Sequence, residues 1–385
     1  MAALKVFIVA AEASGDRLGA DLIKALRSRS EEISFAGIGG KRMAEERVDS
    51  PFDISELSVL GIIEGLKAYP HVVKRVREAT AAIQRFDPDV VVLIDSWGFT
   101  LRVAQALRKI GSRARLIKYI GPQVWASRPG RAKTLAKTVD HLLCIYDIET
   151  QYYAPYGLPC TVVGNPVANA PIHHGDGDAF RRAHNIAFGT PLLLVLFGSR
   201  PAEVERLGPT FLETVKRLRS VIPDLRMMTF AADTVSGRVK QLMTNLPDAL
   251  VLTDEAQKQN VFAAATVALA CSGSVTTELA LQGAPIVVGY RVGAITAFLI
   301  RRFLFKGRFV TLLNIAADDE IVPEFLQEDC RPEALTPVLQ KLLTDKVARD
   351  VQLGKQNAAL QAMGRGKPSA ASIAADVILQ QSLTR

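Results

Sequence analysis

Short runs of valine, isoleucine and leucine recur along the chain, and several of them end in a small polar loop that opens a helical segment. The run KVFIVA leads to Glu12, LLLVLF leads to residues 198–200, and TVALAC leads to residues 272–274. Runs that are apolar at every position are typical of parallel strands that helices bury on both faces. The pattern therefore predicts an α/β fold whose helices begin at the carboxyl ends of its strands.

The length of the chain and the order of these runs predict two domains. A chain of 385 residues, 49% of them hydrophobic, is too long for one ordinary core. We expect an N-terminal domain over residues 1–168, a Pro-, Gly- and His-rich linker over 169–190 and a second domain over 191–345. Residues 346–385 are expected to form helices that pack back across the domains or onto a partner subunit. Both domains should be doubly wound and Rossmann-like, with ligands at the carboxyl ends of the strands.

The charge of the chain favours acidic small partners. The net charge is +8, but the basic residues form no arm or run of like charge, so phosphorylated molecules or anionic lipid headgroups fit better than nucleic acid. The four cysteines lack metal-ligand spacing and are expected to be reduced thiols of a cytosolic protein. No motif calls for a metal or a cofactor.

One apolar and basic segment has two interpretations. Residues 292–310, VGAITAFLIRRFLFKGRFV, mix aliphatic and aromatic residues with four basic ones. A helix lying on a membrane surface has this composition, and so does a core helix whose arginines face solvent. No run of the chain approaches the roughly 20 apolar residues that a membrane-spanning helix needs.

Carboxylates stand at two of the predicted strand ends. Asp95 ends the run DVVVLI, where it could accept a proton from an attacking hydroxyl or cap the next helix. Glu12 follows the first run in a loop of small residues, where it could bind sugar hydroxyls or act as a first-turn acid. Asp16 is expected to be a first-turn residue and not a reactant.

Two other strand ends have the residues of an anion site. Gly198, Ser199 and Arg200 combine close approach, a hydroxyl and a guanidinium fork that matches phosphate. The segment SGSVTTE, residues 272–278, adds hydroxyl groups and a carboxylate that could hold a ribose. Both segments begin helices, whose first N–H groups favour anions. Each could also be a plain strand-to-helix turn.

An ordered set of motifs between about Val6 and Gln327 resembles the lipid A disaccharide synthases. That resemblance implies an inverting GT-B glycosyltransferase that transfers a diacylated glucosamine from UDP to the 6′-hydroxyl of diacylglucosamine 1-phosphate (lipid X). It also implies a cytoplasmic protein attached peripherally to the inner face of the inner membrane, with a second copy of the chain as a candidate partner. The motifs are AEASGDRLGADLIKAL, FAGIGGKRM, SELSVLGIIEGL, LID, YIGPQVWASRPGR, VGNPVAN, FGSRPAEVERL, SGSVTTELAL and GYRV.

The resemblance also implies roles for individual residues. Asp95 matches the proposed general base of the family and Glu12 matches its essential acid. The residues that match the family's UDP-sugar site are Ser199, Arg200, Glu203, Ser272, Gly273, Ser274, Thr277, Glu278 and Asn314.

The chain departs from the family pattern at Gly98, Ser127, Asn165 and Asn169. An alternative interpretation is therefore a paralogue that binds UDP-sugar or lipid with little catalysis. A UDP-sugar epimerase of the same architecture would need acid pairs that the sequence does not show.

Overall fold

The computed structural model describes residues 4–57, 62–125, 128–169, 173–293 and 308–383. The chain divides into two compact units. Unit 1 comprises residues 1–169 and 367–385, and unit 2 comprises residues 170–366. The C-terminal segment thus returns to the first unit, while residues 173–190, expected as a linker, belong to the second. Segment 294–307, which includes most of the apolar and basic stretch, lies outside the described residues.

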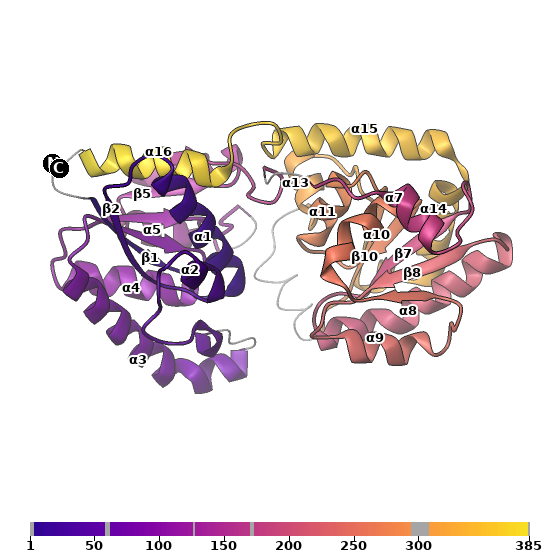
Figure 1. Cartoon of the computed structure of the whole chain (residues 1–385), viewed down its shortest axis with the longest axis horizontal. Helices are drawn as coiled ribbons and strands as arrows, with labels where there is room; N and C mark the ends of the chain where they lie inside the picture. The colour runs from indigo at the N-terminus through magenta and orange to yellow at the C-terminus, as the bar shows by residue number, and fades with distance from the viewer. Residues whose placement is uncertain (1–3, 58–61, 126–127, 170–172, 294–307, 384–385) are drawn as a thin grey trace. The chain divides into compact units, whose positions relative to one another are not determined.

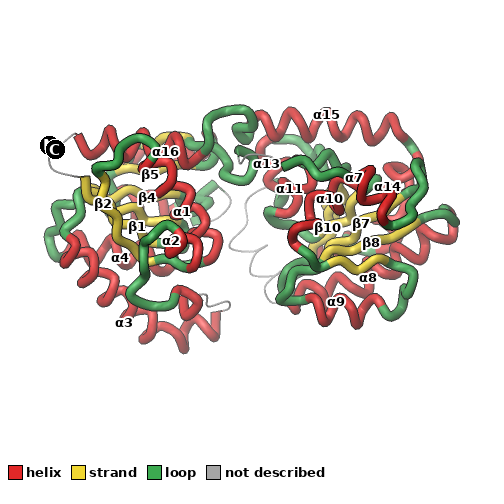
Figure 2. Tube along the Cα trace, in the orientation of Figure 1, coloured by secondary structure: helices red, strands yellow, loops and turns green. Residues whose placement is uncertain are grey.

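Each unit contains one six-stranded parallel sheet with helices beside it (Figures 1 and 2). In unit 1 the strand order is β2-β1-β3-β4-β5-β6. The strands are β1 (Leu4–Val9), β2 (Ile33–Ile38), β3 (Val90–Ile94), β4 (Arg115–Tyr119), β5 (His141–Cys144) and β6 (Cys160–Val162). The helices are α1 (Ala13–Arg27), α2 (Lys41–Glu45), α3 (Ile62–Phe86), α4 (Trp97–Lys109), α5 (Gly130–Ala136), α6 (Thr150–Tyr153) and α16 (Ala370–Leu383).

Unit 2 repeats the arrangement with the strand order β12-β11-β10-β7-β8-β9. Its strands are β7 (Leu192–Leu196), β8 (Arg226–Phe230), β9 (Leu250–Leu252), β10 (Val267–Ala270), β11 (Ile286–Tyr290) and β12 (Glu324–Leu326). Its helices are α7 (Gly177–Ala183), α8 (Pro201–Val221), α9 (Ser236–Met243), α10 (Lys258–Ala264), α11 (Val275–Leu281), α13 (Leu312–Ala317), α14 (Pro332–Thr344) and α15 (Lys346–Ala362). Short 3-10 turns cover Ile54–Leu57, Asp147–Glu149, Ala154–Tyr156, Glu255–Gln257 and Gln327–Asp329.

The continuous apolar runs are explained by burial on both faces of each sheet. In β1, Val6 and Ile8 pack in one core cluster with α1 and α16, while Phe7 and Val9 pack in another with α3 and α4. All five residues of β3 and of β7 are buried. Successive strand side chains point to opposite faces, so a strand covered on both sides has no polar alternation. The predicted α/β class with two doubly wound domains is confirmed.

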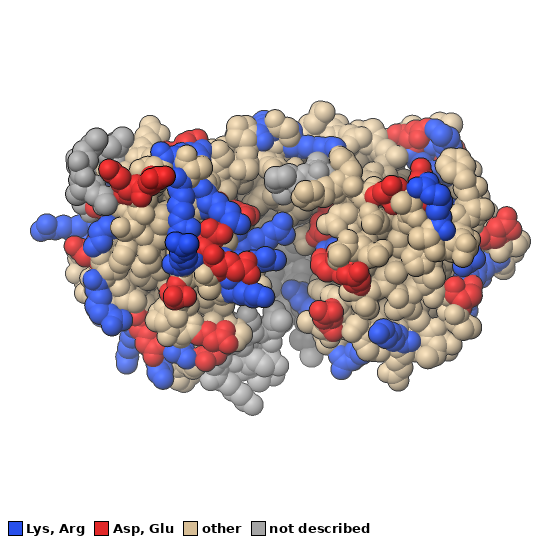
Figure 3. Space-filling view, viewed as in Figure 1, with Lys and Arg blue, Asp and Glu red and all other residues tan. Residues whose placement is uncertain are grey.

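Strand order fixes where ligands can bind. In unit 1 the chain passes from β1 to β2 on one side and to β3 on the other; in unit 2, β8 and β10 lie on opposite sides of β7. The loops that follow β1 and β3, or β7 and β10, therefore diverge and leave a crevice at the carboxyl edge of the sheet. The predicted carboxylates and anion loops follow these four strands. On the face in Figure 3, basic and acidic side chains are interspersed over both units.

Candidate functional site

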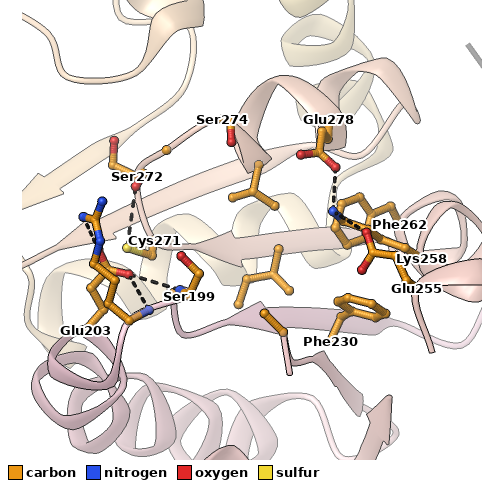
Figure 4. A pocket seen from close by; sticks show the side chains of 16 residues that line it. Ser199, Glu203, Phe230, Glu255, Lys258, Phe262, Cys271, Ser272, Ser274 and Glu278 are labelled. Carbon is orange, nitrogen blue, oxygen red and sulfur yellow. Dashed lines mark hydrogen bonds and ion pairs between the residues drawn. The ribbon is translucent and has the colours of Figure 1, made fainter. Parts of the chain in front are cut away.

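A pocket of about 350 Å³ lies in unit 2 at the divergence between β7 and β10 (Figure 4). Loops after β7, β8, β9 and β10 all contribute to it, as expected of the carboxyl edge of a doubly wound sheet. The lining residues are Leu196, Gly198, Ser199, Arg200, Glu203, Phe230, Ala232, Glu255, Lys258, Phe262, Cys271, Ser272, Gly273, Ser274, Val275 and Glu278.

The loop after β7 is held by a buried carboxylate. Glu203, in the first turn of α8, accepts hydrogen bonds from the N–H groups of Ser199 (3.1 Å) and Arg200 (3.2 Å). Gly198 has φ +103°, and a β-carbon there would lie 2.4 Å from a Glu203 carboxylate oxygen, so only glycine fits. Glu203 thus shapes the loop and occupies N–H groups that sequence analysis had reserved for phosphate. The guanidinium of Arg200, with 58% of its side chain exposed, is the cation left facing the pocket.

The loop after β10 brings three of the predicted residues to the pocket. Ser272, Gly273 and Ser274 line it, and the hydroxyl of Thr276 closes the turn by donating to the Gly273 carbonyl oxygen at 2.8 Å. Thr277 does not line the pocket. Its side chain is fully buried on the other side of α11. The small residues and hydroxyl groups of this turn leave room for an oxygen-rich ligand beside Arg200.

A lysine and two carboxylates form the other part of the pocket. The Lys258 ammonium lies 2.9 Å from a Glu278 oxygen and 3.2 Å from a Glu255 oxygen. Burial disfavours the charged form of Lys258, but Glu278 and Glu255 outweigh burial and raise its pKa. The rings of Phe230 and Phe262 meet edge to face, 6.2 Å apart, at this end (Figure 4). An apolar wall next to an oriented carboxylate suits a base and its ribose.

Asn314 is not at the pocket. It is fully buried, and its side chain is saturated by four hydrogen bonds within its own segment. The amide nitrogen donates to the Val322 carbonyl and to Glu324, both at 2.8 Å, and the amide oxygen accepts from the N–H groups of Ile321 and Val322. This asparagine fixes the loop that follows α13.

In unit 1, Asp95 stands on a tightly constrained turn directly after β3. Its φ is +41°, its side chain is exposed, and its N–H donates to the Tyr119 carbonyl oxygen at 2.9 Å. Its own carbonyl oxygen accepts from the hydroxyl of Thr100 at 2.6 Å and from the ammonium of Lys118. The main chain of Asp95 is therefore tied down while its carboxylate faces outward.

The two acids that follow β1 have different environments. Glu12 is exposed and precedes α1 in an extended conformation, so it lies at the same divergence of strands as Asp95. Asp16 is 4% exposed and accepts from the N–H groups of Gly40, Arg42 and Met43 at 2.7 to 3.0 Å. Asp16 holds the start of α2, which agrees with the expectation that it is not a reactant.

Several residues of both sites are absent from the sequence predictions. Phe230, Glu255, Lys258 and Phe262 belong to the loops after β8 and β9. The strands themselves were predicted, so the residues that follow them were the available signal. Lys118 had a signal too, because it interrupts the apolar run of β4.

Two searches of the structure are negative within the described ranges. No group of three or more His, Cys, Asp or Glu side chains there could hold a metal ion. Among the helices that the structure describes, none has the length and apolar character needed to cross a bilayer.

Two Rossmann-like units with a nucleotide-sized pocket in the second define a GT-B enzyme that acts on nucleotide sugars. Solved structures share this fold: UDP-GlcNAc 2-epimerase from Neisseria meningitidis matches with a TM-score of 0.62 at 12% identity, covering 99% of this chain and 100% of that one. MurG from Acinetobacter baumannii matches with a TM-score of 0.57 at 15% identity, covering 98% and 99%. These likenesses show the fold.

The sequence comparisons show the family. The sequence pattern of lipid-A-disaccharide synthetase matches residues 6–378. The lipid-A-disaccharide synthase of Rhodospirillum centenum is 42% identical over 381 residues, which cover 98% of this chain and 95% of the relative. The chain belongs to the lipid-A-disaccharide synthetase family and is a glycosyltransferase. The resemblance seen in the sequence is confirmed.

Proposed function

We propose that the chain transfers 2,3-diacylglucosamine from UDP-2,3-diacylglucosamine to the 6′-hydroxyl of lipid X. The products are UDP and the β-1,6-linked tetraacyl disaccharide 1-phosphate. Membership of the family over residues 6–378 supports this reaction. The observation that carries the assignment of residues is that each sheet presents a different half of the chemistry at the divergence of its strands: an anion and ribose pocket in unit 2, and exposed carboxylates in unit 1.

The donor half of the reaction belongs to the unit 2 pocket. Arg200, with Ser199, Ser272, Gly273 and Ser274, binds the diphosphate, and Glu278 binds the ribose hydroxyls. As the bond between the sugar C1 and the diphosphate oxygen breaks, UDP leaves with the bonding electron pair, and the guanidinium of Arg200 stabilises the added charge. Glu203 acts on this site through the loop that it holds.

The acceptor half belongs to unit 1. Asp95 accepts the proton of the 6′-hydroxyl as that oxygen attacks C1 of the donor sugar, and attack from the face opposite the diphosphate inverts the anomeric centre. Glu12 binds hydroxyl groups of the acceptor at the same edge. The exposed Asp95 carboxylate on a fixed main chain suits a base that must meet an incoming alcohol.

Turnover by an Asp95→Asn variant tests the proposal. With UDP-2,3-diacylglucosamine and lipid X, wild-type protein should form the disaccharide, and the variant should lose about 10²–10⁴-fold in kcat while binding UDP normally. Asp87→Asn is the matched control, because Asp87 is also exposed, also has positive φ (50°), and precedes the same strand. Full activity of Asp95→Asn, or equal losses in both variants, would refute the assignment.

The proposal includes attachment to the cytoplasmic face of the inner membrane, because both substrates carry acyl chains. The four basic residues within 292–310 would contact anionic headgroups, a contact that salt screens. At low salt the protein should sediment with vesicles that contain an anionic phospholipid. Protein that stays in the supernatant under these conditions would argue against attachment.

A further inference from the structure

A buried lysine contacts the turn that carries Asp95. Lys118 is 2% exposed, and it lies on β4, which pairs with β3. Its ammonium group donates to the carbonyl oxygen of Asp95 and, at 2.7 Å, to the hydroxyl of Thr100. In the part of the chain that the structure describes, no ion pair joins Lys118 to a carboxylate.

A lysine at this position is costly for the fold. Burial lowers the pKa of Lys118 to about 7, and the charge of Asp95 opposes that shift only in part. The other buried residues of β4, Leu116, Ile117 and Tyr119, pack in the two cores of unit 1. An apolar side chain of similar size would fill the strand without the cost of removing an ammonium group from water. Packing alone therefore does not explain the lysine.

The turn above Lys118 needs to be held. Asp95 and Ser96 both have φ +41°, a conformation that non-glycine residues seldom adopt, least of all at two consecutive positions. The Thr100 hydroxyl contacts the carbonyl oxygens of both residues, at 2.6 and 3.0 Å. Lys118 contacts the same Asp95 oxygen and also Thr100, so it joins β4 to both ends of the turn. Its loss would leave the carboxylate of Asp95 on a less restricted main chain.

We propose that Lys118 is a positioning residue for Asp95: its ammonium group, acting with the Thr100 hydroxyl, fixes the left-handed turn on which the Asp95 carboxylate meets the acceptor alcohol. This inference rests on the proposed function, in which Asp95 is the base. It predicts that Lys118 affects the chemical step through Asp95 and does not affect the nucleotide pocket of unit 2.

A Lys118→Met variant of the full chain tests the inference. Its kcat should fall at least tenfold, since geometry at the reacting atoms is lost, while its KM for UDP-sugar and its affinity for UDP should stay within twofold of wild type. Its melting temperature should not fall, because methionine removes a buried charge. Lys109→Met, at an exposed position on α4, is the matched control and should change nothing. A kcat within twofold of wild type would overturn the inference, and so would a parallel loss of UDP affinity and melting temperature.

A double-mutant cycle supplies the readout that a purely structural role would not give. If Lys118 acts through Asp95, adding Lys118→Met to Asp95→Asn should not reduce the residual turnover further; an additional tenfold loss would overturn the inference. Thr100→Val, which removes the second donor to the same oxygen, should lower kcat severalfold and serves if Lys118→Met fails to fold. Full activity of Asp95→Asn would refute the proposed function, whereas an inactive Asp95→Asn with a normal Lys118→Met refutes this inference alone.

Discussion

The active edges of the two sheets differ in the charge that they present. Both sheets have six parallel strands, and both have a divergence beside their first strand, β1 in unit 1 and β7 in unit 2. After β1 and β3 the exposed groups are the carboxylates of Glu12 and Asp95. After β7 and β10 the groups facing the pocket are the Arg200 guanidinium, small residues and hydroxyl groups. One architecture thus provides a proton acceptor in one unit and an anion-binding pocket in the other.

The difference also extends to what lies under each edge. In unit 2 a carboxylate, Glu203, supports the cationic loop, and in unit 1 an ammonium group, Lys118, supports the carboxylate turn. In each case the supporting group is buried and bonds to the main chain of the loop, so the exposed side chain is left to meet a ligand. Substitutions that act on only one edge can test this comparison.

Arg200→Leu should have the largest effect of the substitutions that follow. Removing the cation that faces the departing diphosphate should lower kcat/KM by about 10²–10³-fold and weaken UDP binding, measured by calorimetry. Arg238→Leu is the matched control, since Arg238 lies on α9 of the same unit with a half-exposed side chain paired to Glu205. Equal effects of the two variants would show that Arg200 acts only through net charge.

Lys118→Met should change how stability depends on pH. The unfolded chain holds the Lys118 proton up to pH 10.5 and the folded chain only up to about pH 7, so wild-type stability should rise with pH between these values. The variant should lack this rise. It should be more stable than wild type near pH 7 by a few kcal/mol, with the gap closing toward pH 10.5.

Denaturant unfolding at several pH values measures this gap. In the same unit, burial raises the pKa of Glu149 from 4.5 to about 7. That shift lowers stability as the pH rises through this lower window, equally in both proteins, and so it cancels in the difference. A difference independent of pH would show that Lys118 keeps its ordinary pKa in the folded chain.

Gly198→Ala should disturb the pocket of unit 2 alone. The new methyl group would meet the Glu203 carboxylate at a positive φ, so we expect a loss of about 1–3 kcal/mol in unfolding free energy together with weaker UDP binding. Gly237→Ala is the control, because a β-carbon there meets nothing within 4 Å inside α9. That variant should keep UDP affinity and gain up to about 1 kcal/mol. Unchanged UDP affinity in Gly198→Ala would contradict the role given to this loop.

Thr277→Val should have the smallest effect. The Thr277 hydroxyl is buried and makes no hydrogen bond to the described residues, so replacing it by a methyl group should alter the unfolding free energy by less than about 0.5 kcal/mol. UDP affinity should stay within twofold. A tenfold loss of affinity would place Thr277 at the ligand and would enlarge the pocket described for unit 2.

The sequence was sufficient to predict the fold class and the strand ends that carry the two edges. Continuous apolar runs such as DVVVLI can be buried only between two layers of helices, and the residue after such a run must lie at the carboxyl edge. This is why Asp95, Ser199, Arg200 and Glu278 could be named without coordinates. The same reasoning separated Asp16 from the reactive acids.

The direction in which a side chain points was harder to predict. Within SGSVTTE, one turn of helix separates Ser274 at the pocket from Thr277 in the core, and the hydroxyl residues look alike in the sequence. Asn314 was assigned by resemblance, yet its amide is saturated by its own loop. Glu203 reads as a ligand-facing acid, but it turns back to the N–H groups before it. Loop closure and helix phase, which spacing does not specify, decide these cases.

A crystal structure of the protein with UDP would test the central claim most directly. The account predicts the diphosphate beside Arg200 and the turn after β10, with the ribose on Glu278 and the uracil against the apolar end near Phe230 and Phe262. Asp95 should remain free of the nucleotide. UDP bound at the carboxylate edge of unit 1, or anywhere outside the pocket of unit 2, would contradict the division of chemistry between the two sheets.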